Sequence, residues 1–103
     1  MIHVIAVIRL WPGKRAAFIP EFRAIEPLVR AEAGCIEYGG AIDTPTKIDA
    51  QAPPRDDVVV VIEKWSSEAA LAAHLEAPHM AEYRERVRGM VLDTMIRVLA
   101  PLS

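Results

Sequence analysis

The chain has 103 residues, which is the length of one domain with a single core spanning residues 1–103. Hydrophobic residues make up 52% of it and charged residues 25%, a composition typical of globular and not of disordered chains. The formal net charge is -2 and the basic residues are scattered, so nucleic acid and anionic membranes are not expected partners. The one cysteine, Cys35, excludes an internal disulfide and favours a cytoplasmic location.

The N-terminal part of the chain predicts a strand followed by a helix. Residues 2–10 are apolar at nearly every position, as in a strand buried on both faces, and Pro12-Gly13 ends it. This segment is too short to cross a bilayer and no basic segment precedes it, so we expect neither a membrane anchor nor a signal peptide. Apolar residues at helical spacing predict a helix over 14–32, kinked or interrupted at Pro20 and Pro27.

Two further strands flank a long connection. Gly34 suits the position just past the end of the first helix, and residues 35–43 predict a strand with a bulge at Gly39-Gly40. Residues 44–57 contain three prolines and no apolar period, which predicts an extended, exposed loop. Residues 58–65 are again apolar on both faces and predict a buried strand.

The C-terminal part predicts a broken helix and a last strand. Ser66 or Ser67 can cap the helix, and its buried face is marked by Ala70, Leu71, His74 and Leu75. Pro78 breaks this helix, and a second helical piece continues to about Gly89, with an inward stripe made of Met80, Tyr83 and Val87. Residues 94–99 predict the final strand.

The resulting order, β-α-β-β-α-β, predicts an α+β fold of the ferredoxin-like type, with a four-stranded antiparallel sheet and two helices on one face. Two of the strands are apolar on both faces, yet the helices can cover only one. We therefore expect a homodimer in which the uncovered sheet face of one copy packs on that of another.

A resemblance to a known family rests on three segments, which read IHVIAVIRLWPGKRAAF, EAGCIEY and VIEKWSSEAALAAHLEAPHM. They resemble the antibiotic biosynthesis monooxygenase domain of the dimeric α/β barrel superfamily, over most of the chain except residues 44–57. The resemblance implies a cavity between sheet and helices that holds a flat phenolic or quinol-like substrate. It also implies oxidation by dioxygen without a bound cofactor.

The same resemblance assigns particular residues. Monooxygenases of the family line their site with a tryptophan on the third strand and a tyrosine on the second, and Trp65 and Tyr38 occupy these places. Haem-degrading relatives instead carry an asparagine on the first strand. Here Val7 and Ile8 lie near that position, so haem is not expected as a cofactor.

Four residues are the candidate catalytic group. Trp65 lies two positions after Glu63 on a strand, so both side chains share a face, but each also has a structural explanation. Trp65 can simply fill the core, and an ion pair of Glu63 with Arg9 is favoured over a catalytic role. His74 faces inward and is a natural proton acceptor for a phenol, or else a hydrogen-bonded core histidine. Tyr38 can orient a substrate oxygen or fill the core.

Four further residues are candidates for substrate binding. His79 can line the same pocket, although a role at the start of its helix is favoured. Met80 and Tyr83 suit a pocket wall, and Arg86 can reach the cavity mouth unless it is a solvated charge on the helix face. His74 and His79, five residues apart across a proline, are a poor metal site, so no metal is expected.

We therefore expect a cofactor-free monooxygenase in which His74 is the base, Trp65 and Tyr38 position the ring, and Glu63 tunes the site. Two alternatives stay open. One is an isomerase of a small oxygenated metabolite, in which the same base moves a proton without oxygen. The other is a noncatalytic ligand-binding or stress-response protein of the same fold.

Overall fold

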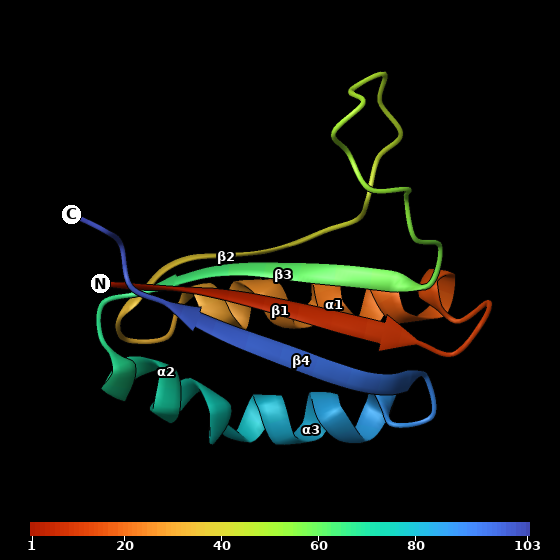
Figure 1. The fold of residues 1–103 in the computed structure, drawn as a ribbon. Coiled ribbons are helices and arrows are strands. Elements are labelled where there is room, and N and C mark those ends of the chain that lie inside the picture. Colours follow the sequence, from red (N-terminus) through yellow and green to blue (C-terminus); the bar gives the residue numbers. More distant parts are fainter.

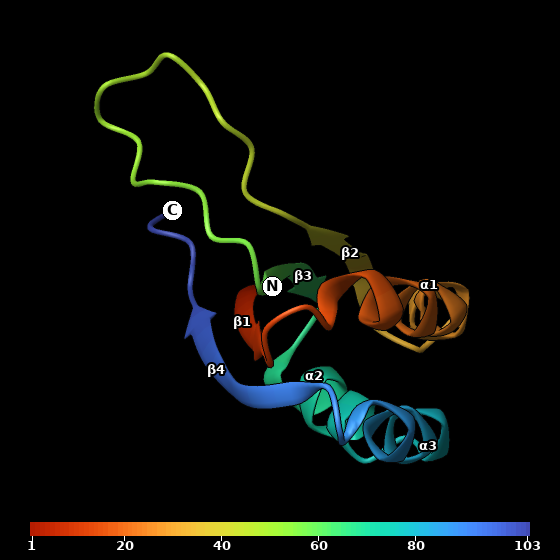
Figure 2. The ribbon, with the colours of Figure 1, turned by 90° about the vertical axis from the view of Figure 1, so that its right-hand side faces the viewer.

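The computed structural model describes residues 1–103 and contains four strands and three helices. In chain order these are β1 (Ile2–Leu10), α1 (Arg15–Arg30), β2 (Cys35–Ala41), β3 (Val58–Trp65), α2 (Glu68–Leu75), α3 (Pro78–Val87) and β4 (Val91–Leu99). The strands form one antiparallel sheet in the order β2-β3-β1-β4. All helices lie on the same side of this sheet (Figures 1 and 2). The predicted ferredoxin-like fold is confirmed, with its second helix divided in two.

The core lies between the helices and the sheet face that points toward them. Side chains alternate along each strand, and those of β1 and β3 that face the helices are Val4, Ala6, Ile8, Leu10, Val59, Val61, Glu63 and Trp65. The helices contribute Phe18, Phe22, Ile25, Val29, Leu71, His74, Met80, Tyr83 and Val87. Burying a large apolar side chain contributes about 1.5–3 kcal/mol. Only two buried residues are polar, Glu63 and His74.

Helix α1 is continuous, so the predicted interruption at its prolines is wrong. Each proline removes one backbone donor and leaves the carbonyl four residues earlier without its helical partner. Pro20 and Pro27 are exposed, and so are Ala16 and Arg23, which carry those two carbonyls. Water can therefore satisfy both carbonyls, and the buried face of the helix keeps its contacts.

The irregularity of β2 also differs from the prediction. The register shifts between Cys35 and Glu37, so the bulge lies at Ile36 and not at Gly39-Gly40. Gly40 instead makes room for the core, because a Cβ atom there would lie 2.9 Å from the ring of Phe22. The glycine pair thus serves helix packing and leaves the ladder intact.

Gly34 lies in the turn between α1 and β2 and packs against the start of α2. It was predicted instead to lie just past the end of α1, as a helix cap. The helix ends at Arg30, and Gly34 follows in the turn with φ of +84°. Its carbonyl accepts a hydrogen bond from the Ser66 backbone at 2.8 Å. A Cβ atom would lie 2.6 Å from the Cβ of Ala70 and 2.7 Å from Oγ of Ser66. Glycine therefore allows the turn after α1 to lie directly against the start of α2.

The remaining elements depart from the predictions at their ends. Ser67 caps α2 by accepting a hydrogen bond from the Ala70 backbone at 3.1 Å. Leu71 and His74 are buried as predicted, whereas Leu75, the last residue of the helix, is 40% exposed. Pro78 occupies the first turn of α3, where a missing donor costs nothing. Strand β4 begins three residues before the predicted position 94.

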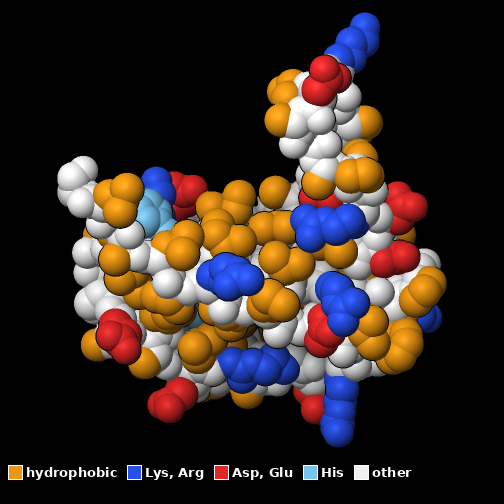
Figure 3. All heavy atoms as spheres, in the orientation of Figure 1, with side chains coloured by type: hydrophobic (Ala, Val, Ile, Leu, Met, Phe, Trp, Pro, Cys, Tyr) orange, Lys and Arg blue, Asp and Glu red, His pale blue; other side chains and the backbone are white.

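The other face of the sheet carries no helix (Figure 2). Figure 3 shows hydrophobic side chains spread over it between basic ones.

As predicted, residues 44–57 contain no helix or strand, and they extend away from the helices. Arg55 clamps the base of this loop by two side-chain bonds to Asp43 of 2.8 and 3.0 Å, which lower the pKa of Asp43 to about 2. None of the helices has the length and apolar composition needed to cross a membrane.

Substituting Gly34 tests the close approach of the turn to α2. Gly34→Ala should destabilise the protein by about 2–5 kcal/mol, because left-handed strain and overpacking add. Gly13 has φ of +80° with open space around it, so Gly13→Ala should cost only the strain, about 1–2 kcal/mol. Gly89→Ala has neither problem and is the control. Chemical denaturation measures all three; equal effects of Gly34→Ala and Gly13→Ala would contradict the packing argument.

Candidate functional site

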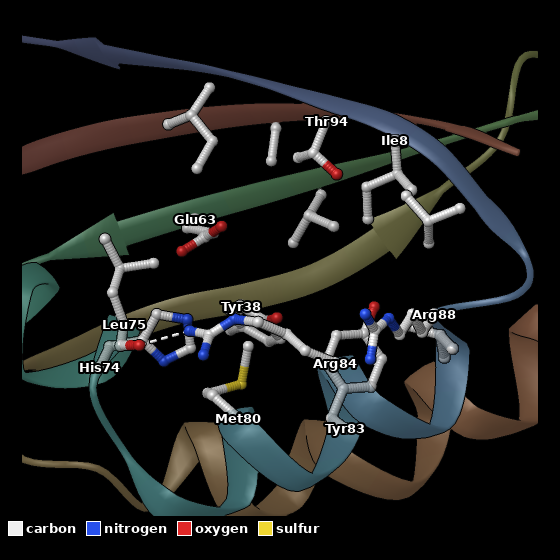
Figure 4. Close-up of a pocket in the computed structure, with 15 residues that line it drawn as sticks. Ile8, Tyr38, Glu63, His74, Leu75, Met80, Tyr83, Arg84, Arg88 and Thr94 are labelled. Atoms are coloured by element: carbon white, nitrogen blue, oxygen red, sulfur yellow. Dashed lines mark hydrogen bonds between the residues drawn. The ribbon is translucent and has the colours of Figure 1, made fainter.

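A cavity of about 370 Å³ lies between the sheet and α2 and α3 (Figure 4). It is within the size range of small-molecule sites. Ten of its fifteen lining residues are hydrophobic, and the others are Glu63, His74, Arg84, Arg88 and Thr94. An apolar pocket with a few convergent polar groups is the arrangement expected of a ligand-binding site.

His74 is held rigidly at one end of the cavity. Its side chain is only 2% exposed, and its ring lies against that of Trp65 with centroids 4.7 Å apart. The ring of Tyr38 packs edge to face against the His74 ring, with centroids 5.5 Å apart. The Nδ1 atom lies 3.1 and 3.0 Å from the two carboxylate oxygens of Glu32. Three neighbours therefore fix the orientation of the imidazole.

The second ring nitrogen of His74 faces the cavity. Every side-chain nitrogen or oxygen atom that is itself fully buried has a hydrogen-bond partner, so an atom without one is accessible. Nδ1 is the only nitrogen of His74 that makes such a bond. Since His74 lines the cavity, Nε2 is the nitrogen that a ligand can reach.

Glu63 projects from β3 into the same space (Figure 4). Its Oε1 atom accepts a hydrogen bond from Nε1 of Trp65 at 2.8 Å, and Oε2 has no partner in the chain. Burial raises the pKa of this carboxyl, against the opposing effects of the Trp65 bond and of His74. The predicted ion pair with Arg9 is wrong, because Arg9 lies on the opposite sheet face and pairs with Asp93.

Two tyrosines complete the polar part of the cavity. Tyr38 and Tyr83 are 4% and 6% exposed, and both line the cavity. Their hydroxyls make no hydrogen bond within the chain, so these oxygen atoms are not fully buried and are open to the cavity. Burial raises the pKa of both phenols, so both hydroxyls stay protonated and can donate to a bound molecule. The Tyr38 ring stacks on Phe22 at 5.6 Å, which holds the hydroxyl in position.

The structure brings some predicted site residues to the cavity and leaves others outside. Those that line it are Tyr38, Glu63, His74, Met80 and Tyr83. Trp65 lies behind Glu63 and His74 without lining the cavity, and His79 donates from Nε2 to Glu32 at 2.7 Å. Arg86 points away and pairs with Glu21 of α1 at 2.9 Å.

The sequence did not assign Arg84, Arg88 or Thr94 of the cavity lining to the site, nor Glu32. Arg84 lines the cavity and donates to the Leu75 carbonyl (Figure 4), and its position one turn after Met80 is a spacing that could have revealed it. Glu32 contacts His74 across 42 residues, and no local pattern links them. The structure contains no group of three His, Cys, Asp or Glu side chains able to hold a metal ion.

The buried carboxyl of Glu63 predicts a pH-dependent stability. Because its folded-state pKa lies above the ordinary value of 4.5, the native state loses stability as pH rises and the buried group ionises. Glu63→Gln retains an acceptor for Trp65 but cannot ionise. Its melting temperature should exceed that of the parent at neutral pH, and the difference should vanish toward about pH 4. Glu37→Gln, at an exposed site, is the control; a difference independent of pH would contradict this account.

Comparisons with known proteins agree with this fold. The family model for antibiotic biosynthesis monooxygenase matches residues 1–86. The chain is 43% identical over 103 residues, and 98% of each chain, to Probable quinol monooxygenase YgiN of Escherichia coli K12. The structure of PA3566 from Pseudomonas aeruginosa matches with a TM-score of 0.80 and 28% identity, over 99% of this chain and 94% of that one. For Rv0793 from Mycobacterium tuberculosis the TM-score is 0.79 and the identity 29%, over 99% and 95%. The chain therefore belongs to the antibiotic biosynthesis monooxygenase family.

Proposed function

We propose that this protein is a monooxygenase that uses dioxygen to oxidise a small phenolic or quinol-type substrate without a bound cofactor. The observation that carries the proposal is the His74 ring, whose free Nε2 faces an apolar cavity while Glu32 holds Nδ1. The 43% identity of the chain to a protein named as a probable quinol monooxygenase supports the same substrate class.

The first step in the proposed reaction is removal of a proton. A phenol or quinol bound with its hydroxyl against Nε2 of His74 passes its proton to the imidazole and becomes a phenolate. Tyr38 and Tyr83 can donate hydrogen bonds to a second oxygen of the substrate and so fix the ring. Trp65 acts from behind, by holding both Glu63 and the His74 ring in place.

The second step is oxidation of the phenolate by dioxygen. The phenolate gives electrons to dioxygen, a carbon–oxygen bond forms at a ring carbon, and the oxygen–oxygen bond then breaks. One oxygen atom stays in the product, and the other leaves as water with the ring-carbon hydrogen and the proton that His74 returns. The apolar walls, including Met80 and Leu75, keep bulk water from the reduced oxygen intermediate.

Arg84, and not Arg86 as the sequence predicted, is the arginine of α3 that we assign to the entrance of the cavity. Its guanidinium lines the cavity and bonds to the Leu75 carbonyl, so it links α3 to the end of α2 (Figure 4). We assign it to substrate entry, together with the pocket wall formed by Met80 and Tyr83. His79 acts on the site only through Glu32.

Replacing His74 tests the proposed base. His74→Gln should lower kcat for oxygen-dependent quinol oxidation by about 10²–10⁴-fold, the usual contribution of general acid–base catalysis. His3→Gln, on the opposite sheet face, is the matched control and should leave kcat unchanged. An oxygen electrode and product analysis over a panel of quinols and naphthols make the measurement, and circular dichroism checks folding.

Three outcomes would contradict the proposal. Equal turnover by the parent and His74→Gln would remove His74 as the base. Conversion that persists under argon would favour the isomerase. A tightly retained small molecule without any turnover would favour the noncatalytic ligand-binding protein.

We also infer that two copies pair through the sheet face that carries no helix. This face exposes Ile62, Met95 and Leu99, with 40%, 58% and 45% of their surfaces accessible in the single chain. Large apolar patches of this kind on a small domain favour association. Two copies related by a twofold axis would bury the same patch on both chains.

A single charge on that face tests the inferred dimer. Ile62→Lys should convert the protein to a monomer in sedimentation equilibrium, because a lysine would be buried without a partner. Leu28→Lys introduces the same charge at a residue 51% exposed on α1 and should leave the dimer intact. A parent protein that sediments as a stable monomer at low micromolar concentration would contradict the inference.

A further inference from the structure

The carboxylate of Glu32 is shared by two histidines from different helices. His74 of α2 approaches it through Nδ1 at 3.0 Å, and His79 of α3 through Nε2 at 2.7 Å. The side chain of Glu32 is 14% exposed, and those of His74 and His79 are 2% and 25% exposed. An ionised carboxylate accepts hydrogen bonds and donates none, so both nitrogens carry the proton.

The backbone places Glu32 at this point. The Glu32 amide donates to the Val29 carbonyl at 2.9 Å, and its carbonyl accepts from the Cys35 amide at 3.2 Å. Two residues later, Gly34 lets the same turn pack against the start of α2. The carboxylate is thus fixed by a tight turn on one side and by His79 on the other.

We propose that Glu32 is the positioning residue of the base His74, and that His79 holds Glu32 in place. This proposal rests on the proposed function, because it assigns to His74 the role of base. Glu32 touches no substrate and acts only through the imidazole.

Glu32 has two effects on His74. First, a proton on Nδ1 leaves the lone pair on Nε2, which is the nitrogen that faces the cavity, so the ring is held in the tautomer that can accept a proton. Second, the imidazolium that forms when Nε2 takes the substrate proton lies beside the carboxylate of Glu32, where the side chains of His74 and Glu32 are only 2% and 14% exposed. A carboxylate that orients a histidine base has both effects in serine proteases.

The other groups that face His74 cannot replace Glu32. Glu63 of β3 bonds to Trp65 through Oε1 and makes no bond to His74. Tyr38 of β2 meets the His74 ring edge to face and makes no bond to either ring nitrogen. Arg84 of α3 bonds to the Leu75 carbonyl. Glu32 is therefore the only hydrogen-bond partner of Nδ1.

The tautomer of His74 can be measured directly by NMR of the ring nitrogens in isotopically labelled protein, without any substrate. The chain has three histidines, so single substitutions assign all the signals. In the parent, neutral His74 should carry its proton on Nδ1. In Glu32→Leu, which removes the acceptor, the proton should move to Nε2. A parent with the proton on Nε2, or an unchanged tautomer in Glu32→Leu, would overturn the proposal.

Glu32→Gln removes the charge of Glu32 but keeps its shape. This variant also replaces Glu32→Leu as the test if Glu32→Leu does not fold. Its amide oxygen can still accept from Nδ1 but carries no charge, so kcat should fall about 10²-fold while KM changes little. Glu26→Gln, on α1 beside Arg30 and outside the cavity, is the matched control. Equal kcat values in Glu32→Gln and the parent would overturn the electrostatic role.

His79 is tested by a conservative rescue. His79→Leu removes a donor to Glu32 and should lower kcat less than Glu32→Gln does, whereas His79→Gln keeps a donor and should restore most of the loss. Equal kcat values for both variants would overturn the role of His79. If the parent has no oxygen-dependent activity, the proposed function fails, yet the tautomer measurement still decides whether Glu32 positions His74.

Discussion

The hydrogen bond between Glu32 and His74 is the contact on which both the packing of the fold and the proposed chemistry depend. A buried imidazole must have a hydrogen-bond partner, and here the partner comes from the turn after α1, far away in the sequence. That turn can reach α2 because Gly34 has no side chain and adopts a left-handed conformation. The same contact leaves Nε2 of His74 open to the cavity, so packing and reactivity depend on one arrangement.

The polar groups of the site lower the stability of the folded protein. Glu63 and His74 are the only polar residues in a core that is otherwise apolar or aromatic. Burial raises the pKa of Glu63, which means that the folded state disfavours its ionised form. A leucine or glutamine in its place would suit a purely structural core better. Retaining an ionisable group beside a histidine and an apolar cavity is typical of a site that transfers protons.

Local patterns in the sequence were sufficient to predict the order of the elements and much of the cavity. The helical stripe predicted that His74, Met80 and Tyr83 face inward, and strand alternation predicted that Glu63 shares a face with Trp65. Arg9 was placed on the wrong face because β1 is apolar on both sides, which conceals its alternation.

Features that depend on contacts between distant segments could not be predicted. Glu32 reaches His74 from the turn that contains Gly34. The prolines of α1 lie on its exposed side, where water can satisfy the carbonyls that they leave free. Gly40 resembles a bulge residue in the sequence, but its role comes from Phe22 on a different element. In each case the role of a residue depends on its surroundings in the folded chain, which its neighbours in the sequence do not reveal.

Isotopically labelled dioxygen gives the most direct test of the central claim, which is that this cavity lets dioxygen oxidise a phenolate formed by His74. Mass spectrometry of the product from the parent protein and a quinol should detect one labelled oxygen atom for each turnover, with the second label in water. A product that carries no label, or that takes its new oxygen atom from labelled water, would contradict the account.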